Sequence, residues 1–122
     1  MKGAQNMQLE QGTWAISANS SPEVLSINHV DPSGAFYGFI IGIDNATDLV
    51  AGWLQENTIT FIRAMFSDFN HNQIYTGIVT EDGTHISGTF VESHVPARQS
   101  DTNPDTYQFE ATRHMASSGN DS

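Results

Sequence analysis

A period of two runs through most of the chain, and it constrains the fold more than any other feature. Between residues 10 and 114, apolar and polar residues alternate in eight short runs that are rich in Ile, Val, Thr, Phe and Tyr. The runs predict strands at residues 10–17, 23–30, 35–43, 47–55, 58–67, 72–80, 84–92 and 106–114. No segment has the 3.6-residue period of a helix, so the sequence predicts an all-β protein.

Short turn sequences separate these runs. Asp31-Pro32-Ser33-Gly34 is typical of a type I turn, and Asp82-Gly83 is a strong hairpin signal. Only residues 93–105 form a long connection. Short links join antiparallel neighbours, and eight such strands favour a closed up-and-down barrel. The alternative is a β-sandwich, which needs more long connections.

One domain accounts for the whole length. The chain has 122 residues, the usual size of a single domain and enough for a hydrophobic core. We expect the barrel to occupy residues 10–116, and the polar ends at residues 1–9 and 117–122 to be flexible. The chain contains no cysteine, which excludes disulfides, thiolate metal sites and cysteine nucleophiles.

The charge balance argues against two classes of partner. The chain has 4 Lys and Arg residues against 14 Asp and Glu residues, a formal net charge of −10. Nucleic acids and anionic membranes both require a cationic surface, so we expect neither to bind. The five histidines lack metal-ligand spacing and no phosphate-binding loop is present, so neither a metal nor a cofactor is predicted. No secretion signal follows Lys2, which favours the cytoplasm over secretion after removal of a signal.

Two tripeptides link the first and last predicted strands to a known pattern. Gly12-Thr13-Trp14 opens the first strand, and Ala111-Thr112-Arg113 lies in the last. The combination resembles the calycin pattern and, within it, is most similar to avidin and streptavidin. The resemblance implies an eight-stranded barrel in which Arg113 packs across Trp14 and closes one end. A guanidinium over an indole face is a favourable contact.

The same resemblance implies a ligand pocket but not the usual ligand. It places Phe61, Tyr75 and Phe90 where avidins carry the tryptophans that enclose biotin. It places Ile16, Ile40 and Gly42 where avidins carry an Asn, a Tyr and a Ser that hydrogen-bond the ureido group; Ser20 alone matches a loop serine. A pocket without these groups would leave a ureido group unpaired, so we reject biotin and keep the pocket. Ile40 and Trp53 are expected to complete its wall.

Arg63 is the most informative charged residue. It shares one strand face with Phe61, and if that face is the barrel interior its charge needs a partner. The partner is either an anionic ligand or an internal carboxylate, for which Glu92 and Glu110 are the candidates. The alternative is that the opposite face points inward and Arg63 is solvated.

Three functions follow from these residues. The first is a small-molecule-binding barrel for an apolar or aromatic ligand, with or without an anionic group at Arg63. The second is a cofactor-independent cyclase, isomerase or dehydratase in which Arg63 and Tyr75 are the candidate catalytic pair. The third is a carbohydrate-binding module that uses an exposed Trp53.

The later strands are apolar on both faces, which predicts an interface. If the aromatic residues point inward, an apolar set points outward, and monomers rarely expose such a patch. We therefore expect a homodimer or homotetramer, and avidins also assemble through that side. The outward set is Leu54, Ile62, Phe66, Ile74, Ile78 and Val91.

Overall fold

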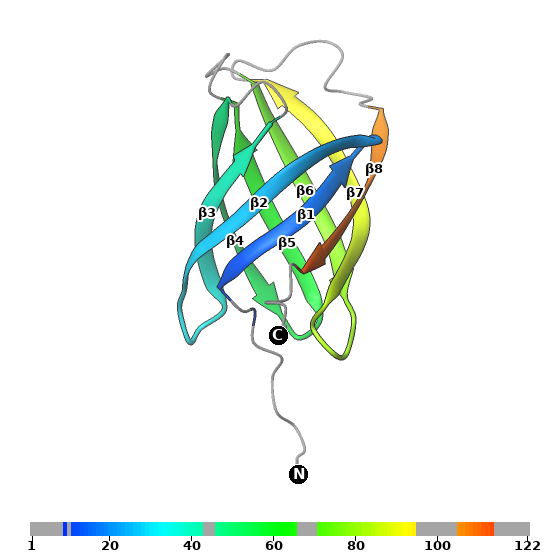
Figure 1. The fold of residues 1–122 in the computed structure, drawn as a ribbon. Coiled ribbons are helices and arrows are strands. Elements are labelled where there is room, and N and C mark those ends of the chain that lie inside the picture. Colours follow the sequence, from blue (N-terminus) through cyan, green and yellow to red (C-terminus); the bar gives the residue numbers. More distant parts are fainter. Residues whose placement is uncertain (1–8, 10, 43–45, 66–70, 95–104, 114–122) are drawn as a thin grey trace, which may run out of the picture.

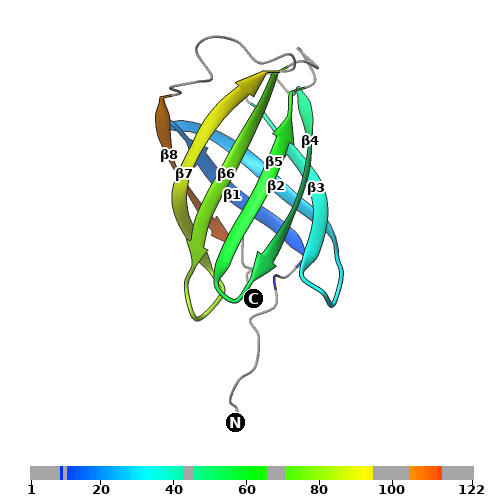
Figure 2. The same cartoon turned by 180° about the vertical axis from the view of Figure 1, so that it is seen from behind.

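Eight strands close into one antiparallel barrel (Figure 1, Figure 2). The computed structural model describes residues 9, 11–42, 46–65, 71–94 and 105–113. Each strand pairs with the next and the last pairs with the first, so the predicted up-and-down barrel is confirmed and the sandwich alternative is wrong. The strands are β1 (Gly12–Ala18), β2 (Ser21–Val30), β3 (Ala35–Ile41), β4 (Thr47–Gln55), β5 (Thr58–Ala64), β6 (His71–Val79), β7 (His85–His94) and β8 (Thr106–Arg113).

All eight predicted strands occur, with small differences at their ends. β2 begins at residue 21 rather than 23, because a two-residue turn at Asn19 and Ser20 joins it to β1. Both turn residues have positive φ, 51° and 69°, as the tight hairpin turn that suits twisted strands requires. β7 runs two residues beyond its predicted end. The predicted strand residues 10, 43, 66–67 and 114 lie outside the described residues.

Pairing of β1 with β8 closes the barrel. In this pair Trp14 is directly opposite Arg113. Opposed residues of an antiparallel pair carry their side chains on the same face, so Arg113 shares the inner face with the fully buried Trp14. The predicted proximity of the two residues is therefore confirmed in the strand register.

The barrel has a lower and an upper end in the orientation of Figure 1. The lower end carries the start of β1 and the end of β8. Leu54, Ile59 and Leu9 are buried there with Trp14 in one hydrophobic cluster. Flexibility was expected for residues 1–9, but Leu9 is part of the core; residues 1–8 and 117–122 lie outside the described residues. Within the described ranges, no helix is long and apolar enough to cross a membrane.

The middle of the barrel is filled by aromatic rings. Phe61, Tyr75 and Phe90 lie opposite one another on β5, β6 and β7. Their rings stack in sequence, with centroids 4.6 Å apart at both steps. Phe109 meets the rings of Phe61 and Tyr75 edge-on. Phe61 and Tyr75, two of the three predicted pocket aromatics, therefore belong to a packed core rather than to the wall of an open pocket.

The side chains of β4 that face inward are not the set that was expected. Gly52 lies opposite Phe61, and a Cβ on this glycine would lie 2.5 Å from the Cβ of Phe61. The even-numbered residues of β4 consequently face inward, so Leu54 is buried and Trp53 is exposed. The predicted inward Trp53 and outward Leu54 are both wrong. Hydrophobicity favours the aromatic Trp53 as the inward residue, whereas the inner position is Gly52, which makes room for the ring of Phe61.

The outer face of β3 to β6 exposes large apolar side chains. Ile62 and Ile78 point outward as predicted, and Ile74 and Val91 are half-buried. Phe66 lies outside the described residues. We define the outer apolar face by its exposed members Tyr37, Leu49, Ile62 and Ile78.

Candidate functional site

The inner face changes character toward the upper end of the barrel. In β2, Glu23 is in phase with the buried Leu25, and in β5, Arg63 is in phase with the buried Phe61. Alternation along each strand puts such residues on one face. The same rule brings five polar side chains together above the aromatic core: Glu23, Asp48, Arg63, Gln73 and Glu92.

Arg63 lies inside the barrel and is held by two carboxylates. Its Nε donates to Asp48 Oδ2 at 2.7 Å. Its Nη1 and Nη2 donate to the two oxygens of Glu23 at 2.9 and 3.0 Å. Arg63 is 5% exposed and Asp48 is 3% exposed, so this is a buried ion-pair network. The interior location is confirmed and the solvated alternative is wrong.

The partners of Arg63 differ from those expected. Glu110, one candidate, is exposed on the outside of β8. Glu92, the other, is hydrogen-bonded to Gln73 Nε2 at 3.0 Å. The two N–H groups of Arg63 that would bind a ligand carboxylate already donate to Glu23. The expectation of an anionic ligand at Arg63 is therefore not supported by the geometry.

A tyrosine and an amide link the ion pair to the aromatic core. Tyr75 donates its hydroxyl to Gln73 Oε1 at 2.7 Å, and Arg63 Nη1 lies 3.4 Å from the Tyr75 oxygen. Burial raises the pKa of Tyr75 to about 12, although Arg63 opposes this shift. Burial alone would lower the pKa of Arg63, but hydrogen bonds to Glu23 and Tyr75 raise it above its ordinary value. Both groups therefore keep their protons at neutral pH.

Glu92 is the accessible carboxylate of the network. Its side chain is 37% exposed, against 12% for that of Glu23. The Nε2 of His71 lies 3.1 Å from Glu92 Oε2, in an orientation that makes no well-aligned hydrogen bond. The ring of His71 stacks on that of His94 with centroids 4.8 Å apart. The upper end of β6 and β7 thus carries a carboxylate bordered by imidazole rings.

A cavity of about 270 Å³ lies over this network. It has an aromatic side, where the rings of Phe90 and Tyr107 lie 5.2 Å apart. It has a charged side formed by Arg63, Glu23 and Glu92. We call it the upper cavity, and its lining residues are Ala18, Asn19, Ser21, Glu23, Arg63, Met65, Gln73, Phe90, Glu92 and Tyr107.

Two of the six predicted ligand-binding residues line the upper cavity. These are Arg63 and Phe90. The other four do not reach it: Phe61, Tyr75 and Ile40 are fully buried, and Trp53 is on the outside. The candidate catalytic pair is in contact, with Arg63 Nη1 3.4 Å from the Tyr75 oxygen, but only Arg63 borders the cavity because Tyr75 has no exposed surface.

Most of the cavity lining was missed by the sequence interpretation, although the strand phase contained the signal. Glu23 and Gln73 sit two residues before buried residues, and Glu92 sits two residues after Phe90. Each is thus an inner-face polar residue at the same end of the barrel. In the part of the chain that the structure describes, no group of three or more His, Cys, Asp or Glu side chains is arranged to hold a metal ion.

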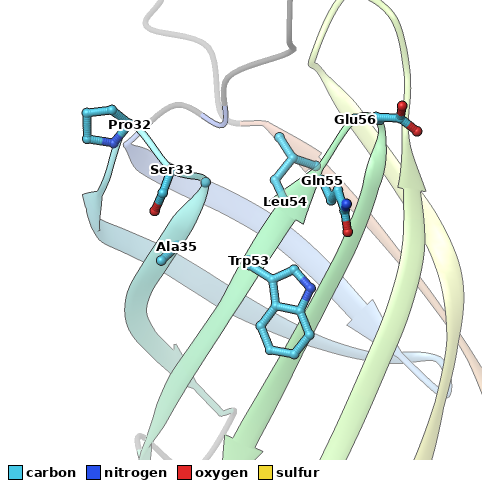
Figure 3. Close-up of a pocket in the computed structure, with 8 residues that line it drawn as sticks. Pro32, Ser33, Ala35, Trp53, Leu54, Gln55 and Glu56 are labelled. Atoms are coloured by element: carbon cyan, nitrogen blue, oxygen red, sulfur yellow. The ribbon is translucent and has the colours of Figure 1, made fainter.

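A second hollow lies at the lower end of the barrel in the orientation of Figure 1, and Figure 3 draws the residues that line it. It has a volume of about 530 Å³ and lies between the turn before β3 and the turn after β4. The indole of Trp53 is 49% exposed at this hollow, and Ser33, Gln55 and Glu56 add polar groups. Glu56 has a φ of 58°, a conformation that costs a side chain such as Glu some strain. We call this the Trp53 hollow.

Comparison with solved structures identifies the fold. A shwanavidin variant in complex with biotin superposes with a TM-score of 0.69 at 17% identity, covering 91% of this chain and 100% of that one. Xenavidin gives 0.66 at 19% identity, covering 85% and 96%. The biotin-binding protein from chicken gives 0.62 at 18% identity, covering 86% and 95%. No protein-family profile and no curated protein matches the sequence. The chain has the closed eight-stranded barrel fold of avidin-like proteins, as the resemblance in its first and last strands implied.

Proposed function

We propose that the barrel binds a small organic molecule in the upper cavity. The observation that carries this proposal is a cavity of about 270 Å³ with aromatic rings on one side and charged groups on the other. Small-molecule sites combine apolar walls with a few convergent polar groups in this way, and this one is near the lower limit of their usual size. A ligand of about one ring with short substituents suits it.

The fold neighbours support the site but not their own ligand. Two of them carry biotin in their names, and a barrel of this kind leaves room for a small ligand at one end. In this chain the interior positions that the resemblance assigns to a biotin hook are Ile16 and Ile40, both fully buried apolar residues. A ureido group would find no partner on them. The proposed ligand is therefore an apolar or aromatic molecule other than biotin.

A blocking variant tests the proposal. Ala18 lines the cavity, so Ala18→Phe fills it, whereas Ala15→Phe adds the same ring on the outside of β1. We expect a library of small aromatic fragments to shift the NMR signals of Phe90 and Tyr107. Ala18→Phe should abolish these shifts and Ala15→Phe should leave them intact. Absence of shifts in the unmodified protein, or shifts that survive Ala18→Phe, would contradict the proposal.

The Trp53 hollow favours glycan binding as a second candidate function. A sugar ring stacks on an exposed aromatic face while polar side chains bind its hydroxyls, and this hollow offers Trp53, Ser33 and Gln55. The chain has two tryptophans, and Trp14 is fully buried, so quenching of the fluorescence by acrylamide reports mainly on Trp53. Protection from quenching by oligosaccharides, reduced in Gln55→Ala, is the expected result. Unchanged quenching across a glycan panel would reject this function.

We further propose that the outer apolar face joins copies of this chain into a dimer or tetramer. Ile62 and Ile78 are 43% and 50% exposed, and Leu49 and Tyr37 extend the same surface over β3 and β4. A monomer rarely leaves so many large apolar side chains in water on adjacent strands. The upper cavity lies at one end of the barrel, so assembly through the outer face leaves it unobstructed.

A further inference from the structure

We propose that the ligand of the upper cavity is a cation: a protonated amine, amidine or guanidine carried on a flat apolar body. This inference rests on the proposed function and names the ligand class of the same cavity. It reverses the charge that Arg63 suggests when the sequence is considered alone. Three features of the described residues carry it: the occupied guanidinium, the excess of carboxylates, and the position of Glu92 beside aromatic rings.

Arg63 has little capacity left for an anion. A guanidinium has five N–H donors. Asp48 accepts from Nε, and Glu23 accepts from Nη1 and Nη2. The second Nη1 donor faces Gln73 Oε1 and the Tyr75 oxygen at 3.5 and 3.4 Å. An anionic ligand would have to displace a buried carboxylate from its ion pair, which is costly.

The charge of the site is negative. Two carboxylates, Glu23 and Asp48, pair with the one guanidinium, and a third, Glu92, is linked to it through Gln73. Arg63 is the one cationic side chain among the described residues that line the cavity. The whole chain has a formal net charge of −10, so its electrostatic field attracts cations and repels anions. A protonated His71 would offset one charge and still leave the group negative.

The carboxylate of Glu92 is the group that would bind a cation. Its carboxylate is the most exposed of the three and lines the cavity. Phe90, two residues earlier on β7, and Tyr107, opposite Phe90 on β8, form the adjoining wall. A planar cation can therefore lie against the half-buried ring of Tyr107, beside the nearly buried Phe90, where the ring quadrupole favours it while its N–H groups donate to Glu92.

Three probes of nearly equal shape test the charge preference. They are benzamidine, which is cationic at pH 7, benzamide, which is neutral, and benzoate, which is anionic. Their dissociation constants are measured from NMR shifts of Phe90 and Tyr107 in the full chain. We expect benzamidine to bind at least about tenfold more tightly than benzoate, with benzamide between them.

A pair of isosteric variants locates the preference. Glu92→Gln removes the carboxylate at the cavity and should reduce the ratio of benzamidine to benzoate affinity at least about threefold. Glu110→Gln removes the same charge from the outside of β8 and should change that ratio by less than about twofold. Circular dichroism of both variants verifies that the barrel is retained.

The outcomes separate this inference from the function on which it rests. Shifts at Phe90 and Tyr107 with benzoate bound as tightly as benzamidine would overturn the cation preference and leave the ligand site standing. An equal effect of Glu92→Gln and Glu110→Gln would overturn the role of Glu92. No shift with any probe, nor with the fragment library, would count against the upper cavity as a ligand site and against this inference together.

Discussion

Arg63 and Glu23 lie 40 residues apart in the sequence and form a bidentate ion pair inside the barrel. They belong to β5 and β2, which are separated by two strands, so the pair ties together two walls of the barrel. It also sets the floor of the upper cavity. Because Arg63 is paired with Glu23, its guanidinium is not free to bind a ligand. The carboxylates near the upper cavity then outnumber its one cationic side chain.

Loss of the guanidinium should destabilise the fold strongly. Arg63→Met leaves Glu23 and Asp48 buried without a cation, and we expect the free energy of unfolding to fall by about 3–5 kcal/mol. The double variant Arg63→Met/Glu23→Gln should recover part of that loss, because it removes one of the unpaired charges. Urea denaturation measures both. A loss below about 1 kcal/mol in the single variant would mean that the pair contributes no more than a surface salt bridge.

Trp14 is the largest fully buried side chain, and its removal should leave a cavity at the lower end. Trp14→Ala should lower the free energy of unfolding by about 3–5 kcal/mol. Trp14→Phe should cost less, because it keeps a ring and removes an indole N–H that has no hydrogen-bond partner among the described residues. Trp53→Ala changes the exposed tryptophan and serves as the control, with an expected loss of about 0.5 kcal/mol in the free energy of unfolding. Equal losses at the two tryptophans would contradict the burial of Trp14.

Tyr75 should make stability depend on pH in the alkaline range. Its pKa is raised from an ordinary value of 10 to about 12 in the folded state. Between these values the unfolded chain releases the proton that the folded chain keeps, so deprotonation favours unfolding. The contribution of Tyr75 to the free energy of unfolding is therefore fully present below pH 10. It is lost between pH 10 and 12, a fall of about 2–3 kcal/mol. Urea unfolding at several pH values should show this fall in the unmodified chain and a smaller one in Tyr75→Phe. Parallel curves for the two proteins would contradict the prediction.

Charge on the outer apolar face should divide the assembly. Ile62→Asp and Ile78→Asp each place a carboxylate on an exposed strand position, where a monomer tolerates it and a close apolar interface does not. Sedimentation velocity at micromolar concentration should show an oligomer for the unmodified chain and a 13.3 kDa species for the double variant. A monomer in both cases would disprove the interface. Thr112→Asp, on an exposed polar position of β8 away from this face, is the control for added charge.

The fold was predictable because its evidence is local. Alternation and turn residues define eight antiparallel neighbours, and closure follows when Trp14 and Arg113 are recognised as first- and last-strand partners. Which side chains of β4 face the barrel interior was not predictable from hydrophobicity, because Leu54 and Trp53 are adjacent and both apolar. Gly52 decides it, and its role becomes visible only when its partner across the sheet is known to be Phe61.

The candidate site was predictable only in part, because two of the six predicted ligand-binding residues, Arg63 and Phe90, line it. The strand phase left Arg63 as either an interior or a solvated charge. It did not identify its partners, which are Asp48 on the neighbouring strand β4 and Glu23 on the more distant strand β2. Which carboxylate reaches a buried guanidinium depends on strand stagger and on rotamers, and neither is encoded in local patterns. Extending the strand phase to its upper ends would have revealed Glu23 and Gln73 as inner-face residues.

The most direct measurement is a crystal structure of the protein soaked with benzamidine. We expect density for the aromatic ring against Phe90 and Tyr107, with the amidinium within hydrogen-bond distance of Glu92 and the Arg63–Glu23 pair intact. Density confined to the Trp53 hollow or to the outer face, or an upper cavity filled by side chains of the protein, would contradict the assignment of the upper cavity as the ligand site.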